Sequence, residues 1–355
     1  MRIAILTQPL GHNYGGILQN YALQTILRKM GHSPITFDQV NWLAPLRYRI
    51  AHKIKWTILT KLGKEYPIDH TYDCIENFTK KHIISTAKAT SSYKLKQLDK
   101  KFKPDAYIVG SDQVWRPDYV FSIINNFLGF TNNKHKIAYA ASFGNDNPIF
   151  NNKELYICKD LINKFSAISV RENSGVEICE NLFNIDATHV LDPTMLLTTN
   201  DYESLCSDNQ QQSDNYLFTY ILDSDSQKQE YIKKIIYSHN IYEFASEYNF
   251  HGKKEHTLSV EDWIMGIKNA HMIVCDSFHG TVFSILFNKN FWVLENKNRG
   301  NTRIQSLLSM FGLEDRLISD TNYIHQKGID WNSVNNKLRY LRNNSIEFLS
   351  NSLRI

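Results

Sequence analysis

The chain has 355 residues, of which 42% are hydrophobic and 21% are charged, as in an ordinary soluble globular protein. A chain of this length is too long for one typical core and predicts two domains of roughly 150 to 200 residues each. The formal net charge of +4 is too small for a dedicated nucleic-acid-binding protein, and no basic cluster is interleaved with aromatic residues, so we expect no nucleic-acid partner.

The chain opens with a pattern typical of a β–α–β unit. Residues 2–7 indicate a strand, residues 16–30 carry a helical stripe of apolar residues that stops at Gly31, and residues 34–37 indicate the next strand. The apolar stretch at the start of the chain is shorter than that of a signal peptide, and polar residues follow it too soon. The five cysteines are odd in number and lack paired spacing, which favours reduced thiols over a structural zinc site. We therefore expect a cytoplasmic protein.

Residues 44–64 form a basic segment that contains aromatic residues. Such a segment could lie on an anionic membrane surface, at the inner face of the membrane. A solvated connecting helix is the alternative that we favour. No stretch of the sequence reaches the ~18 uninterrupted apolar residues of a transmembrane helix, so any membrane contact would be peripheral.

The rest of the first half continues the alternation of strands and helices. Strands are expected at residues 106–110, 136–142, 167–170 and 188–191, with helices at residues 153–165 and 174–182. The segment from Thr198 to Asn215 is rich in Ser, Asp, Asn and Gln and has no periodicity, which is typical of a linker. The predicted first domain is therefore residues 1–197, followed by a linker at residues 198–215.

A second alternating set follows the linker. Strands are expected at residues 216–222, 241–246, 272–275 and 291–295, with helices at 227–238, from Ser259 onward, at 281–287 and at 302–313. These elements define a second domain at residues 216–330, and residues 331–355 hold a C-terminal helix. The pattern predicts an α/β fold with two Rossmann-like, doubly wound domains that face a cleft.

The stretch from Met272 to Phe287 is the most informative part of the sequence. It indicates a short buried strand, a polar turn that carries His279, and a helix that opens at about Gly280. The N-terminus of a helix attracts anions, and an imidazole beside a bound anion can act as a general acid or base. The alternative is that Asp276 or Ser277 caps the helix and His279 only fills the turn.

This run, Asp-Ser-Phe-His-Gly-Thr, resembles the C-terminal signature of the polysaccharide pyruvyltransferase family. Further stretches that resemble the family occur in the family's order between about residue 3 and residue 315. They are Gly15 to Leu23, Tyr107 to Trp115, Ser169 to Glu172, Leu191 to Thr194 and Asn298 to Arg303. Any one of these stretches is weakly specific, but the ordered set is fairly specific.

The resemblance implies a fold of the glycosyltransferase-B kind, with the donor in the C-terminal half and the acceptor in the N-terminal half. It also implies transfer of a pyruvate group from phosphoenolpyruvate to hydroxyls of a sugar, which gives a pyruvate ketal and releases phosphate. The acceptor would be a nucleotide-linked or lipid-linked glycan. No cofactor and no metal are expected, because no His, Asp or Glu cluster has the spacing of metal ligands.

Phosphoenolpyruvate carries a carboxylate and a phosphate, and arginine is the bidentate partner for each. Arg299, Arg303 and Arg171 are the candidates that the resemblance supplies. Arg303 could instead point to solvent or form a salt bridge with Glu314 or Asp315, and Arg171 could form an ordinary ion pair. The other expected donor-binding residues are Ser277, Gly280 and Thr281.

His279 is the candidate acid of this chemistry, and Asp112 could orient or deprotonate the acceptor hydroxyl, although a capping role in its turn is an equal alternative. Family members often have an Arg-Leu pair where this chain has Ser277 and Phe278, which places more weight on Arg299 and Arg303. The candidate acceptor-binding residues are Gly15, Gly16, Gln19, Asn20, Ser111 and Trp115. A sugar could stack on the Trp115 ring, although a core position is the stronger interpretation of this residue.

Two other classes of function fit the same sequence. A glycosyltransferase with a nucleotide-sugar donor would share the fold and could bind a diphosphate at the same helix N-terminus, but it needs a clamp for the ribose and base that we do not find. A non-catalytic glycan-binding protein is the second, and the presence of His279, Asp112 and the arginines argues against it.

Overall fold

The computed structural model describes residues 1–40, 72–206, 215–246, 257–296, 300–321 and 328–354. Two parallel sheets form the framework. The first has the strand order β2-β1-β3-β4-β5-β6 and the second has the order β11-β10-β9-β7-β8. The strands of the first sheet are β1 (Arg2–Leu6), β2 (Ser33–Thr36), β3 (Ala106–Val109), β4 (Lys136–Ala141), β5 (Ala167–Val170) and β6 (Thr188–His189). Those of the second are β7 (Tyr216–Tyr220), β8 (Tyr242–Ala245), β9 (Met272–Cys275), β10 (Asn290–Leu294) and β11 (Leu317–Ile318).

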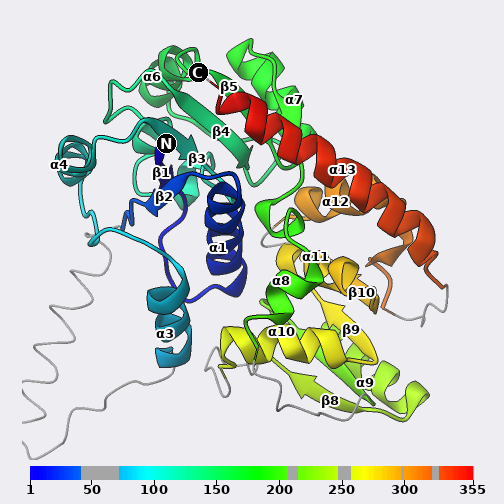
Figure 1. Ribbon diagram of the computed structural model, residues 1–355. Coiled ribbons are helices and arrows are strands. Elements are labelled where there is room, and N and C mark those ends of the chain that lie inside the picture. The colour runs from blue at the N-terminus through cyan, green and yellow to red at the C-terminus, as the bar shows by residue number, and fades with distance from the viewer. Residues whose placement is uncertain (41–71, 207–214, 247–256, 297–299, 322–327, 355) are drawn as a thin grey trace, which may run out of the picture.

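Helices separate the strands along the chain, as parallel pairing requires (Figure 1). In the first half they are α1 (Tyr14–Lys29), α3 (Asp73–His82), α4 (Ser92–Phe102), α5 (Ile123–Asn126), α6 (Asn152–Ile162) and α7 (Asn173–Ile178). The remaining helices are α8 (Thr199–Glu203), α9 (Ser226–His239), α10 (Val260–Asn269), α11 (Phe278–Leu286), α12 (Thr302–Phe311) and α13 (Trp331–Ser352). This arrangement confirms the predicted α/β fold with two Rossmann-like domains.

The central strands follow from their composition. All four residues of β3 and all four of β9 are buried, and both strands are continuous apolar runs, because helices cover both faces of a parallel sheet. Polar caps set where helices begin. The Asn13 side chain accepts a hydrogen bond from Gly16 N at the start of α1, and Ser277 Oγ accepts one from Gly280 N at the start of α11.

The structure differs from the predicted elements in three respects. Helix α11 begins at Phe278 rather than near Gly280, because Ser277 is its N-cap. Helices α3 and α4, which bury only two residues and one residue, were not predicted. The predicted linker contains α8, which Thr198 and Asp201 cap reciprocally, while residues 207–214 lie outside the described part of the chain.

Helix α13 begins beside the second half and crosses to the first, where it ends near the helices of the first sheet (Figure 1). Its Ser345 Oγ accepts a hydrogen bond from Leu191 N at 3.0 Å, and its Arg342 Nε donates to Met195 O at 2.6 Å. The Ser352 carbonyl lies 2.8 Å from His135 Nε2. The C-terminal helix therefore fastens the second half of the chain to the first.

The two halves also meet through the start of α1. The Tyr14 ring stacks on Trp263 of α10 at a centroid distance of 5.3 Å, and its hydroxyl donates to the Leu258 carbonyl at 2.7 Å. One cluster of buried apolar residues includes Ile3 and Ile5 of the first sheet together with Phe218 and Ile273 of the second. The halves consequently share a continuous core.

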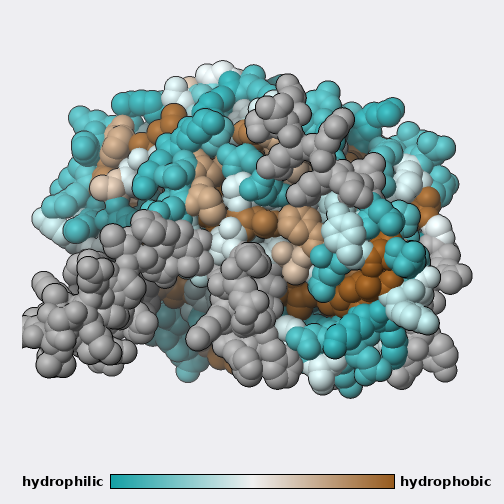
Figure 2. Space-filling model, turned by 90° about the horizontal axis from the view of Figure 1, so that it is seen from below, coloured by the Kyte–Doolittle hydropathy of each residue, from teal (hydrophilic) through white to brown (hydrophobic). Residues whose placement is uncertain are grey.

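None of the helices among the described residues has the length and apolar character needed to cross a bilayer. On one face of the molecule the described surface is largely hydrophilic, and apolar residues show only in smaller patches (Figure 2). The basic segment at residues 44–64, for which peripheral membrane contact was considered, lies outside the described residues.

Candidate active site

Charged side chains from the first sheet meet three helix N-termini. Asp112, Arg171 and Asp192 follow the strands β3, β5 and β6, and the starts of α1, α11 and α12 lie against them. Ligands of open α/β sheets bind at the carboxyl ends of the strands, and helix N-termini favour anions. We therefore examine this junction as the candidate active site.

Arg171 occupies the centre of the junction. Its side chain is buried, with Nη1 2.9 Å from Asp192 Oδ2 and Nη2 3.3 Å from Asp112 Oδ1. Its guanidinium carbon also lies 4.2 Å from the centroid of the Phe278 ring, which comes from the second half of the chain. Burial alone would lower the pKa of Arg171, but the two carboxylates raise it above its usual value. Arg171 therefore stays charged and joins both halves.

Asp192 was not among the predicted site residues, although it lies in the stretch Leu191 to Thr194 that resembles the family, and the structure places it in the junction. Its Oδ2 accepts hydrogen bonds from Arg171 and from Ser111 Oγ, and its Oδ1 accepts from the Thr194 backbone and hydroxyl. Burial would raise the pKa of Asp192, but His279, Arg171 and Thr194 together hold it well below its usual range. The signal available in the sequence was its position directly after the strand predicted at residues 188–191.

His279 lies inside the first turn of α11 rather than in a turn before the helix. Its Nε2 is 3.8 Å from Asp192 Oδ2, an ion-pair distance that is too long for a hydrogen bond, and this nitrogen is buried with no hydrogen-bond partner among the described residues. Gly15 lies against the Nδ1 side of the His279 imidazole. A Cβ on Gly15 would overlap the His279 imidazole at Nδ1, so the first turn of α1 fixes the position of the ring.

Asp112 is held by an unusual backbone. Its φ is +70°, in the left-handed region, and its carbonyl accepts hydrogen bonds from Val114 N and Ser142 N. Burial would raise the pKa of Asp112, but the charges of Arg171, His279 and Arg303 lower it. Asp112 is therefore a carboxylate at neutral pH, and its Oδ2 lies near Gly16 at the start of α1.

Arg303 is buried in the first turn of α12, so the alternative of a solvent-pointing side chain is wrong. Its pKa is lowered to about 10, first by burial and then by the charge of Arg171, while Asp112 and Glu172 act in the opposite direction. Glu172 is also buried, and burial raises its pKa despite the nearby arginines. A cation buried beside a second cation favours an anionic ligand between them.

Several predicted ligand-binding residues have internal partners instead. Gln19 donates to Thr7 Oγ1 and accepts from Ser111 N, while Ser111 Oγ supports Asp192. Asn20 accepts a hydrogen bond from Thr36 Oγ1 inside the first domain. These residues are fully buried and hold the strand ends in place.

The donor-side residues next to His279 are engaged in the same way. Ser277 caps α11, Thr281 Oγ1 donates to the Ser277 carbonyl at 2.9 Å, and Gly280 packs so closely on Cys275 that a Cβ would lie 2.9 Å from the Cys275 Cβ. The prediction that Trp115 stacks on a sugar is wrong for this structure. Its ring is completely buried against Phe127 at a centroid distance of 5.0 Å. Arg299 lies outside the described residues.

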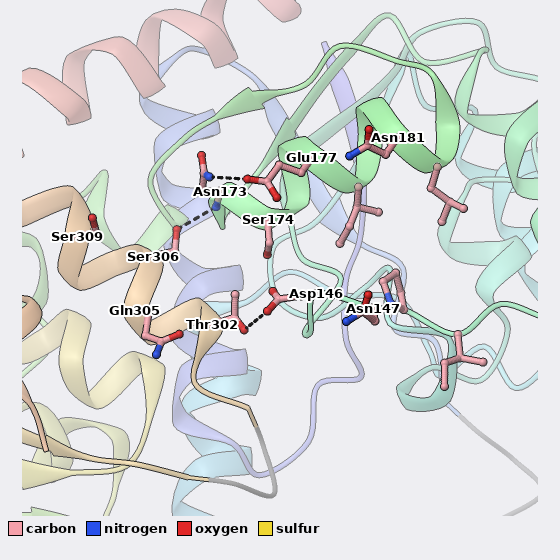
Figure 3. Close-up of a pocket in the computed structure, with 14 residues that line it drawn as sticks. Asp146, Asn147, Asn173, Ser174, Glu177, Asn181, Thr302, Gln305, Ser306 and Ser309 are labelled. Atoms are coloured by element: carbon pink, nitrogen blue, oxygen red, sulfur yellow. Dashed lines mark hydrogen bonds between the residues drawn. The ribbon is translucent and has the colours of Figure 1, made fainter. Parts of the chain in front are cut away.

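A cavity of about 810 Å³ is lined by residues that stand close in sequence to two residues of this junction, since Asn173 is two positions after Arg171 and Thr302 directly precedes Arg303. It lies between α7, the segment after β4, and α12, so both halves of the chain line it (Figure 3). Two hydrogen bonds connect its walls. Thr302 Oγ1 donates to Asp146 Oδ2 at 2.8 Å, and Asn173 N donates to Ser306 Oγ at 2.9 Å.

Comparison with known proteins gives a family and a fold. A family model described as "Polysaccharide pyruvyl transferase" matches residues 13–298, whereas no curated protein matches the chain. Among solved structures, a UDP-GlcNAc 2-epimerase from Methanocaldococcus jannaschii in complex with UDP-GlcNAc and UDP is 13% identical, with a TM-score of 0.50 over 96% of this chain and 99% of that chain. A putative UDP-N-acetylglucosamine 2-epimerase from Listeria monocytogenes is 10% identical, with a TM-score of 0.55 over 99% of this chain and 90% of that chain. Because the sequence identities are this low, the structural similarity shows a shared two-domain fold alone.

Proposed function

The chain belongs to the polysaccharide pyruvyl transferase family, and from this premise we propose that it moves a pyruvate group from phosphoenolpyruvate onto two hydroxyls of a saccharide. The product is a pyruvate ketal, and inorganic phosphate is released. The observation that carries the donor assignment is the burial of Arg303 beside Arg171, where burial and like charge lower the pKa of Arg303 to about 10. Arg171 is already paired with Asp112 and Asp192, and a small anion on the Arg303 side of this cluster would form charge-assisted hydrogen bonds with a second guanidinium.

The helix N-termini support the same donor. The starts of α1, α11 and α12 lie around the arginines, and each provides backbone N–H groups and a partial positive charge. Phosphoenolpyruvate has a carboxylate and a phosphate on one three-carbon frame, so it needs two such cationic regions close together. We assign them to Arg303 and Arg171 with the adjoining helix starts.

His279 is placed to act as the general acid. Asp192, which stays ionised, lies 3.8 Å from Nε2 and faces this nitrogen. In the first step, Nε2 gives its proton to the methylene carbon of phosphoenolpyruvate, which leaves oxocarbenium character at C2. Asp192 then acts as a positioning residue, because it works through His279 and Arg171.

Bond formation at C2 completes the reaction. One saccharide hydroxyl oxygen bonds to C2 and gives its proton to Asp112, which the charges of Arg171, His279 and Arg303 keep ionised. The bond between C2 and the phosphate oxygen breaks with its electron pair, and phosphate leaves. The second hydroxyl oxygen then bonds to C2. Of the two hydroxyl protons, one restores the proton that His279 gave and the other protonates the phosphate, so the step balances.

Thermal unfolding with and without ligand tests the donor. Phosphoenolpyruvate at ~100 times its dissociation constant is expected to add about 2.7 kcal/mol to the free energy of unfolding, while UDP-GlcNAc adds nothing. Arg303→Gln is expected to lose this stabilisation. The control is Arg339→Gln, which changes an exposed arginine on α13 and should keep it.

His279→Gln separates binding from chemistry. This variant is expected to retain stabilisation by phosphoenolpyruvate, while phosphate release in the presence of saccharides falls by about 10²- to 10⁴-fold, the usual contribution of a general acid. Stabilisation by UDP-GlcNAc alone would indicate a glycosyltransferase with a nucleotide-sugar donor. Stabilisation by neither ligand would overturn the donor assignment.

A further inference from the structure

The cavity between α7 and α12 is not accounted for by the donor site. Its volume of about 810 Å³ lies within the range of ~300–1,000 Å³ that is typical of small-ligand sites. The residues first considered for the acceptor, such as Gln19 and Ser111, are fully buried and engaged with each other. The acceptor therefore needs another place.

The polar lining of the cavity suits hydroxyl groups. Amides and hydroxyls point into it from both halves of the chain, and Figure 3 shows Ser174 directed from α7 toward Thr302 and Asp146. The Ser174 hydroxyl oxygen is buried and has no hydrogen-bond partner among the described residues. A buried hydroxyl without a partner is costly, so a ligand that bonds to it gains affinity.

The charges of the lining indicate which saccharides fit. Asp146 and Glu177 are the ionisable groups among the described residues that line the cavity, and no lysine or arginine is among them. Two carboxylates repel an acidic ring and accept hydrogen bonds from neutral hydroxyls. Apolar side chains of Pro148, Ile149 and Leu182 complete the wall and can pack on the C–H face of a sugar ring.

On both sides of the cavity, residues of the wall are close neighbours in sequence of the arginines of the junction. Asn173 follows Arg171 and Glu172 directly, and Thr302 precedes Arg303. The backbone that carries the two arginines therefore also carries part of the cavity wall. Because α7 and α12 come from different halves, the cavity exists only when the halves are packed as they are in this structure.

We propose that this cavity binds an uncharged saccharide ring of the acceptor, and that its carboxylates exclude acidic sugars. The role of the bound sugar as the acceptor rests on the proposed pyruvyl-transfer function, but binding of the sugar in the cavity does not depend on that function.

Saturation-transfer NMR on the full chain tests the proposal without turnover. The probes are the methyl glycosides of glucose, galactose and mannose, set against the methyl glycoside of glucuronic acid. At least one neutral glycoside is expected to bind at least tenfold more tightly than the glucuronide. Glu177→Gln, which removes one charge but keeps the shape, is expected to narrow that ratio.

Two variants with matched controls locate the site. Ser309→Trp fills the cavity from α12 and is expected to weaken binding of the neutral glycoside at least tenfold, whereas Ser333→Trp on α13 should not. Gln305→Ala removes a hydrogen-bonding group and is expected to weaken binding about two- to tenfold, whereas Gln97→Ala on α4 should not.

Phosphoenolpyruvate binding in the same variants keeps the two proposals distinct. If no neutral glycoside binds, or if Ser309→Trp binds it as well as the wild type does, the cavity assignment is wrong even where phosphoenolpyruvate still stabilises the protein. If glycosides bind in the cavity but phosphoenolpyruvate binds nowhere, the cavity assignment stands and the pyruvyl-transfer function fails.

Discussion

At the scale of single residues, the contact between Gly15 and His279 joins the two halves at the reacting group. The glycine has an ordinary helical conformation, so only the space beside it requires the missing side chain. The sequence predicted Gly15 as an acceptor-binding residue. In the structure the space beside Gly15 is occupied by the imidazole of His279.

Gly15→Ala is expected to displace His279, because the new Cβ would overlap the ring. We expect a loss of about 1–3 kcal/mol in the free energy of unfolding from overpacking, and at least a tenfold loss of phosphate release. Gly16→Ala is the matched control, since the nearest atom to its Cβ would be 3.8 Å away. It should keep activity and unfold at the same or a higher urea concentration. Equal behaviour of the two variants would show that the contact does not matter.

Asp192 links stability to pH. The pKa of Asp192 in the folded protein lies below the value of ~3.9 for an unfolded aspartate, so its ionised form stabilises the fold above about pH 4. That contribution is lost as the pH falls below this value toward the folded pKa. Asp192→Asn lacks the charge and leaves Arg171 with one carboxylate fewer, so we expect it to destabilise the protein by about 3 kcal/mol at pH 7.

Urea unfolding at a series of pH values checks this expectation. The gap between the wild type and Asp192→Asn should narrow steadily from pH 5 toward pH 2. Asp160→Asn is the control, because its carboxylate is 67% exposed in a surface pair with Lys164 and should matter little at any pH. A gap that stays constant with pH would mean that the charge of Asp192 is not what stabilises the fold.

At the scale of elements, α13 is the helix that spans both halves. Its Leu349 is completely buried, whereas Tyr340 on the same helix is 65% exposed. Leu349→Ala is expected to lower the free energy of unfolding by about 2–4 kcal/mol because it opens a cavity, and Tyr340→Ala should change it by less than about 0.5 kcal/mol.

Hydrogen exchange distinguishes local from global loosening in these variants. Faster exchange in Leu349→Ala is expected in the peptide that covers residues 188–197, since Leu191 N donates to Ser345 on α13. If exchange increases only within α13 itself, the helix is a peripheral addition rather than a brace.

The elements show which parts of the fold the sequence determines locally. Strands β5 and β9 were predicted with their observed bounds, because each is a short apolar run that follows a polar break. The start of α11 was placed two residues late, because Phe278 and His279 look like turn residues until Ser277 is recognised as the cap. Helix α4 was not predicted, although Leu95, Leu98 and Phe102 recur at helical spacing and pack against the core of the first half.

At the scale of the whole molecule, the two-domain fold was predictable, but the assembly of the site was not. Asp112, Arg171 and His279 were each recognisable at the end of a strand or the start of a helix. Their convergence depends on how the two sheets face each other, which periodicity within one chain segment does not encode. For the same reason, Asp192 was not predicted as a site residue, since its partners lie 21 and 81 residues away in sequence.

The shared surroundings of His279 also restrict how this chain can exchange parts with its relatives. The histidine lies in the second half, whereas Gly15 and Asp192, which fix its ring and face its Nε2, lie in the first. A hybrid gene that joins this first half to the second half of a relative would need a histidine at the matching place, and the reverse hybrid would need both a glycine and an aspartate. The halves look like modules in the sheet topology, yet they must be inherited as a pair.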